Sequence, residues 1–256
     1  MWQDIKSIYG DTAKFSRAYP LLFLVPVLVE MAQHVVELQA GMYFDEAGAK
    51  AAEADSLRLQ FGFAKTLALL LPGYWFVRYI LMPDRQRAVR FEMPAAALFA
   101  VVFAFSAMQL WWSLFGPGLV ENTGLEGKAA TAATVVQEIA AQVLSIYLTA
   151  WMVAWPLGNA SIGPFRSFAV MHGSFWYALV LMLAAVIPLM LLHYGFAIAA
   201  VLILPPTLDW LAMVLDSVVV GYLALTLAGS AAYAAKRAAH RNNVDLLPVA
   251  ITRAIS

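Results

Sequence analysis

The sequence predicts an all-α fold, a polytopic transmembrane helix bundle, and three observations lead to that prediction. Of its 256 residues, 62% are hydrophobic and only 12% are charged, whereas a soluble domain is about half apolar and about 25% charged. Six stretches are long and apolar enough to cross a bilayer as helices, which takes about 20 residues each. The basic residues gather in alternate connecting segments, as the positive-inside rule describes. An ordinary soluble globule and a disordered chain are therefore excluded.

Residues 1–19 precede the first span and are expected to form an amphipathic helix on the inner membrane surface. Apolar side chains recur there at helical spacing, and basic side chains lie between them, a pattern typical of interfacial helices. The apolar set is Trp2, Ile5, Tyr9, Phe15 and Tyr19, and the basic set is Lys6, Lys14 and Arg17.

Six spans are predicted in order, within one integral membrane domain that covers residues 1–256. They are 20–39, 61–82, 95–115, 131–155, 167–192 and 207–233, and a basic tail, 234–256, follows. The apolar segment 193–206 fits either a re-entrant or interfacial piece or, with shifted boundaries, a seventh span. Irregular backbone is not tolerated against lipid, so a re-entrant piece would have to be covered by protein or lie in the interface.

The charges give the direction of the spans. If both termini are cytoplasmic, all but four of the 16 Lys and Arg residues lie on the inner side, the exceptions being Lys50, Arg58, Lys65 and Lys128. Seven spans would move the basic tail outside. The pattern therefore favours six spans, with the N-terminus and the C-terminus in the cytoplasm.

One inner loop carries three arginines within six residues, namely Arg85, Arg87 and Arg90. These side chains suit anionic lipid headgroups, which attract basic residues by about 1 kcal/mol each. The other interpretation is that they serve only as the topology signal.

Ionisable residues inside the spans are candidates for function, because burying them in the membrane costs several kcal/mol. Glu30, His34 and Glu37 share one helical face, because their spacings are four and three residues. Glu138 in span four and Asp216 in span six are expected at a similar depth, in the outer half of the membrane. This polar cluster either joins helices by hydrogen bonds or forms a functional site that relays protons or binds a cation.

No cofactor is predicted outright, and two kinds remain open. A divalent metal would use Glu30, His34 and Glu138, because oxygen and nitrogen ligands suit Zn²⁺ or Mn²⁺. Haem would need an axial histidine, for which His34, His172 and His193 lie in or near spans. The chain has no cysteine, which excludes disulfides and thiolate metal sites.

The segment 163–188 carries a resemblance to known proteins. A basic helix start, then a Gly-x-Phe-Trp motif, then a long apolar span resembles bacterial six-span inner-membrane proteins of the YciC-like and glycerophosphodiester-phosphodiesterase membrane-domain families. The matching residues are Arg166, Ser167, Gly173, Phe175 and Trp176. The resemblance implies a helix bundle located in a bacterial inner membrane, and it carries over no catalytic residue.

The motifs of soluble enzymes, such as a P-loop or GxSxG, are absent from the sequence, and no basic nucleic-acid surface stands out. The favoured hypothesis is a non-enzymatic membrane protein, either an accessory subunit of a membrane complex or a lipid or envelope factor. Its expected partners are membrane lipids and a larger complex or further copies of itself. The alternatives are a small transporter or channel for protons, a divalent cation or a small solute, and a membrane-embedded metal or haem protein.

Overall fold

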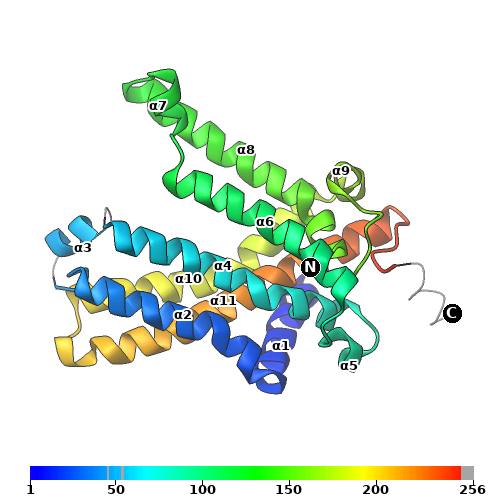
Figure 1. Ribbon diagram of the computed structural model, residues 1–256, viewed down its shortest axis with the longest axis horizontal. Coiled ribbons are helices and arrows are strands. Elements are labelled where there is room, and N and C mark those ends of the chain that lie inside the picture. Colours follow the sequence, from blue (N-terminus) through cyan, green and yellow to red (C-terminus); the bar gives the residue numbers. More distant parts are fainter. Residues whose placement is uncertain (45, 53–54, 249–256) are drawn as a thin grey trace. The chain divides into compact units, whose positions relative to one another are not determined.

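The computed structural model describes residues 1–44, 46–52 and 55–248, and every regular element within them is a helix (Figure 1). The chain divides into two compact units. The first comprises residues 1–90 with 180–233, and the second comprises residues 91–179 with the chain from 234 onward. Each unit is described on its own below.

Among the described residues, five helices are long and apolar enough to cross a membrane. This finding agrees with an integral membrane protein built as a helix bundle. The five are α2 (Pro20–Gln39), α6 (Met93–Phe115), α8 (Gly127–Ala154), α10 (Phe175–Leu202) and α11 (Pro206–Arg241). The predicted span 61–82 lies in α4 (Ser56–Leu81), which is not among them, because Arg58, Lys65 and Arg78 make it more polar.

The expected fifth span, 167–192, does not correspond to one continuous helix. A short helix, α9 (Pro164–Met171), is followed by a turn at Gly173, whose φ of 71° favours glycine, and α10 then runs from Phe175 to Leu202. Most of the segment 193–206 therefore continues α10. A single glycine, Gly195, costs a helix only about 1 kcal/mol, so the first effective stop is Pro205-Pro206.

The last helix, α11, is longer than the predicted span 207–233. It takes in the first eight residues of the predicted basic tail, because Ala, Lys and Arg are strong helix formers. The part of that tail from residue 249 onward lies outside the described residues.

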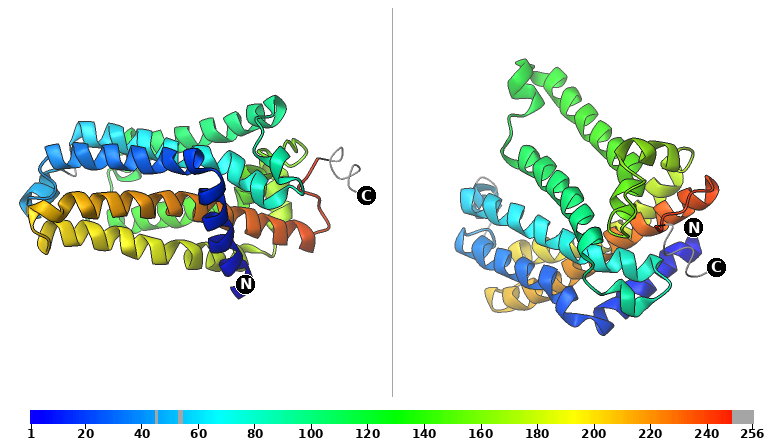
Figure 2. Two further views of the ribbon diagram at one scale, coloured as in Figure 1. Left: turned by 90° about the horizontal axis from the view of Figure 1, so that it is seen from below. Right: turned by 45° about the vertical axis from the view of Figure 1, so that its right-hand side comes forward.

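The first unit contains α1 (Trp2–Ala18), α2, α3 (Glu46–Ala52), α4, α5 (Arg85–Ala88), the later part of α10 and most of α11. A break at Tyr19, followed by Pro20 in the first turn of α2, turns the chain between α1 and α2. Two views show α2, α4, α10 and α11 running side by side (Figure 2). These four helices hold the candidate site.

Aromatic packing and close helix contact stabilise this unit. Phe15 of α1 packs against Phe76 and Tyr79 of α4 and Leu225 of α11. Gly221 of α11 lies against α2, where an added Cβ would come within 2.6 Å of the Val27 side chain. Small residues let membrane helices approach in this way.

The second unit contains α6, α7 (Leu119–Thr123), α8, α9, the start of α10 and the end of α11. Val102, Leu148 and Trp151 form its core cluster. The side chain of Ser167 ties α9 to α8, because its Oγ accepts from the Trp151 backbone N–H and donates to the Tyr147 carbonyl. The Asn159 amide donates to the carbonyls of residues 245–247, which fastens the chain after α11.

Candidate functional site

Ionisable side chains from α2, α4, α10 and α11 meet inside the first unit. Three of them lie at matching positions along their helices. Glu30 is nine residues before the end of α2, His193 is nine before the end of α10, and Asp216 is ten after the start of α11. At 1.5 Å per residue this is about 14–15 Å from the helix ends, or about half the thickness of the hydrocarbon layer.

Asp216 is the centre of the first set of contacts, and it is only 2% exposed. Its Oδ2 lies 3.0 Å from Nε2 of His34 on α2. Both of its carboxylate oxygens lie 2.8 Å from Nδ1 of His193 on α10. One carboxylate therefore joins three helices through two imidazoles.

Glu37 is the centre of the second set. The Tyr43 hydroxyl donates to its Oε2 over 2.7 Å, and Nδ1 of His34 lies 3.2 Å from the same oxygen. The Gln33 amide and the Arg58 guanidinium donate to Oε1 over 2.8 Å and 3.2 Å. His34 thus has a carboxylate on each ring nitrogen, Glu37 at Nδ1 and Asp216 at Nε2.

Tyr43 lies in the turn after α2 and is buried. Burial, reinforced by the negative charge of Glu37, raises the pKa of the Tyr43 hydroxyl. The hydroxyl therefore stays protonated at neutral pH and keeps its role as a donor to Glu37.

Glu30 pairs with α4. Its Oε2 lies 3.0 Å from the Lys65 ammonium, and the carboxylate is 1% exposed. Its Oε1 lies 3.7 Å from Nε2 of His34. Buried charges in membranes occur in such pairs because an isolated charge would be too costly.

The charge balance of the cluster depends on the protonation of His34. Three carboxylates, Glu30, Glu37 and Asp216, face two cations, Lys65 and Arg58. With neutral imidazoles these groups would carry one net negative charge, whereas a protonated His34, which donates from both ring nitrogens to Glu37 and Asp216, balances the third carboxylate.

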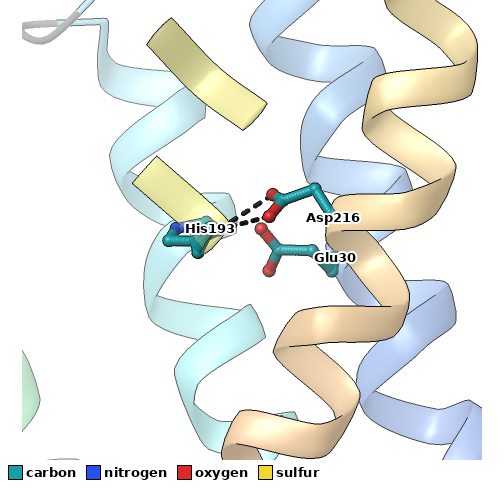
Figure 3. Close-up of side chains that lie close together, drawn as sticks. All are labelled: Glu30, His193 and Asp216. Atoms are coloured by element: carbon teal, nitrogen blue, oxygen red, sulfur yellow. Dashed lines mark hydrogen bonds and ion pairs between the residues drawn. The ribbon is translucent and has the colours of Figure 1, made fainter. Parts of the chain in front are cut away.

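Three of these side chains point toward one another in an arrangement that suits a metal ion. Glu30, His193 and Asp216 each offer one ligand atom, and these atoms all lie within 4.8 Å of one another (Figure 3). Figure 3 shows the imidazole of His193 facing both carboxylates. The metal set predicted from the sequence, Glu30, His34 and Glu138, has only Glu30 in common with this group.

The structure brings together four of the five predicted cluster residues, Glu30, His34, Glu37 and Asp216. Glu138 lies on α8, in the second unit, and is exposed. The predicted headgroup residues Arg85, Arg87 and Arg90 are exposed at and just after α5. Arg85 also donates to the Tyr79 hydroxyl.

The sequence reasoning did not assign His193, Arg58, Tyr43 or Gln33 to the cluster. For Gln33 a signal existed, because it lies four residues before Glu37, the spacing of neighbours on a helix. His193 was not assigned to the cluster because the fifth span was predicted to end at residue 192, which left this residue outside the membrane. Arg58 and Tyr43 lie in the predicted outer loop, and only the folded chain brings them to α2.

The comparisons with known proteins give no identity: no family model, no curated protein and no solved structure matches this chain.

Proposed function

We propose that the protein is a small cation transporter or channel of the bacterial inner membrane, with its binding site at the buried charge cluster of the first unit. One observation carries the proposal: carboxylates and imidazoles from three helices converge about half a membrane thickness from the helix ends. Secondary transporters bind their substrates and coupling ions near the midplane. Ionisable groups within a membrane are expensive, and in known membrane proteins they mark substrate and ion pathways and proton relays.

A sixth span is part of this proposal, and α4 supplies it. The helix has 26 residues and packs beside α2, and at 1.5 Å per residue it is about 39 Å long. Its basic residues do not exclude a membrane position, because Lys65 pairs with Glu30 and Arg58 pairs with Glu37. With α4 included, six spans place both termini on the cytoplasmic side, where the basic residues gather.

Transport by proteoliposomes tests the proposal. Purified protein is reconstituted, and the entry of Zn²⁺, Mn²⁺ and protons is followed with trapped fluorescent indicators. We expect flux of at least one cation above that of protein-free liposomes. Asp216→Asn should reduce this flux by about tenfold or more, because it removes the charge that two imidazoles contact.

Glu126→Gln is the matched control, because this residue is an exposed acid at the start of α8. It should keep the wild-type flux. Flux equal to that of protein-free liposomes for all three cations would overturn the proposal. In that case, co-purification with a larger complex in mild detergent would identify the protein as an accessory subunit.

A further inference from the structure

We infer that Glu30, His193 and Asp216 form a binding site for a divalent transition-metal cation, of which Zn²⁺ is the best chemical fit. The inference rests on the proposed function, since it names the class of cation, but the site can be tested without transport. It differs from the set that helix spacing suggested, because it draws one residue from each of α2, α10 and α11.

The distances between the three side chains are close to those that a metal site needs. Zn²⁺ binds histidine nitrogen and carboxylate oxygen at about 2.0–2.2 Å, which separates neighbouring tetrahedral ligand atoms by about 3.3–3.6 Å. The three ligand atoms lie within 4.8 Å of one another, and His193 Nδ1 lies 2.8 Å from each Asp216 oxygen. A bound ion would replace the hydrogen bonds between His193 and Asp216, and these side chains would move to the ligand separation given above.

The ligand types select among cations. One imidazole with two carboxylates suits zinc and its neighbours in the transition series, whereas Mg²⁺ and Ca²⁺ take oxygen ligands alone. Two ligand carboxylates also neutralise a divalent charge.

In metal sites, residues outside the set of ligands contact the ligands and orient them. Two residues, His34 and Lys65, are placed to do this here. His34 lies 3.0 Å from Oδ2 of Asp216 and 3.7 Å from Oε1 of Glu30. One ring nitrogen, Nε2, therefore lies near both carboxylates. Lys65 fixes the other oxygen of Glu30.

A small pocket adjoins Asp216, the one proposed ligand among its lining residues. It has a volume of about 10 Å³, and His34, Tyr43 and Asp216 line its polar side. A space of this size is about what one water molecule needs. Three protein ligands with a water in the fourth position is a common arrangement for zinc.

Binding of Zn²⁺ to the purified full chain in detergent tests the inference. Isothermal titration calorimetry should find one saturable site per chain. Glu30→Gln, His193→Ala and Asp216→Asn should each weaken binding by about 100-fold, and His34→Ala by about 10–100-fold, as removal of an outer partner does. His240→Ala, an exposed histidine on α11, should bind as the wild type does.

Lys65→Met separates a metal site from a merely structural ion pair. Removing the ammonium beside Glu30 makes the cluster more negative, so Zn²⁺ affinity should rise by about tenfold or more. A purely structural role for these residues predicts no gain of affinity.

A measurement on the unmodified protein keeps the inference testable even where a variant does not fold. X-ray absorption at the zinc edge of the loaded wild type should give nitrogen and oxygen ligands at about 2.0–2.2 Å, with the outer scattering of one imidazole. Absence of saturable Zn²⁺ binding, or scattering from two or more imidazoles, would overturn the assignment. Zn²⁺ binding without flux would retain the site and reject the transport function, whereas flux of protons without Zn²⁺ binding would do the reverse.

Discussion

His34 and Asp216 are 182 residues apart in the sequence, and their Nε2 and Oδ2 atoms lie 3.0 Å apart inside the first unit. This contact joins the first predicted span to the last. It closes a continuous set of polar contacts that runs from Arg58 through Glu37, His34 and Asp216 to His193. The predictions below test this set of contacts and the packing around it.

The first prediction concerns the coupling of His34 with Asp216. In detergent, His34→Gln and Asp216→Asn should each lower the free energy of unfolding, and their effects should not add. A double-mutant cycle should give a coupling energy of about 1–3 kcal/mol, the range for residues in one hydrogen-bonded network. Additive effects would show that the two side chains do not interact.

The second prediction concerns the ion pair between α4 and α2. Arg58→Met leaves one oxygen of the buried Glu37 without its guanidinium partner, so the free energy of unfolding should fall by about 1–3 kcal/mol. Thermal unfolding in detergent measures the change. Arg90→Met, at an exposed position after α5, should leave the unfolding temperature unchanged, and an equal loss in both variants would contradict the assignment.

The third prediction concerns Arg78, a fully buried residue near the end of α4. Its guanidinium donates to the Ala88 carbonyl over 3.0 Å and lies 5.2 Å from the centre of the Tyr74 ring. Arg78→Met leaves that carbonyl unsatisfied, which should cost about 1–3 kcal/mol.

Limited proteolysis checks the local part of this effect. Cleavage in the segment 82–92 should become faster in Arg78→Met, because the buried side chain holds this segment to α4. Lys128→Met, at an exposed position of α8, is the control. Unchanged cleavage in Arg78→Met would show that other contacts fix the segment.

The fourth prediction compares two helical glycines. Gly221→Ala places a methyl group within 2.6 Å of Val27 and 2.9 Å of the Phe23 ring, so it should destabilise the protein by about 1–3 kcal/mol, as overpacking does. Gly195→Ala has no heavy atom within 4 Å of the added carbon. It should be neutral or stabilising by up to about 1 kcal/mol, because alanine favours a helix. The reverse order of stability would contradict the close approach of α11 and α2.

The fifth prediction concerns the exposed arginines at and after α5. If they hold anionic headgroups, replacing Arg85, Arg87 and Arg90 by alanine should lower the amount of anionic lipid retained in mild detergent, at about 1 kcal/mol for each residue. Native mass spectrometry of the purified protein measures the bound lipid. Equal retention by the triple variant and the wild type would leave these residues as a topology signal only.

Only part of the candidate site could be predicted from the sequence. The spacing of Glu30, His34 and Glu37 fixed their common face of α2, because helix geometry is local. Their pairing with Lys65 and Arg58 depends on how α4 packs against α2, which no local pattern encodes. The place of His193 in the site was not predicted for a related reason. The predicted span ended where the apolar run was interrupted, whereas the helix continues through Gly195 to Leu202.

Composition and periodicity by themselves determined that this chain forms membrane-length helices and carries carboxylates within them. Those properties follow from residue types within about 20 neighbouring positions, where helix geometry and hydropathy act. Only the tertiary structure decided which charged groups meet. It placed His193 beside Asp216 and Lys65 beside Glu30, and it put Glu138 in the other unit. The physical reason is that ion pairs and metal ligands depend on atomic distances between helices, and the packing of side chains far apart in the sequence sets those distances.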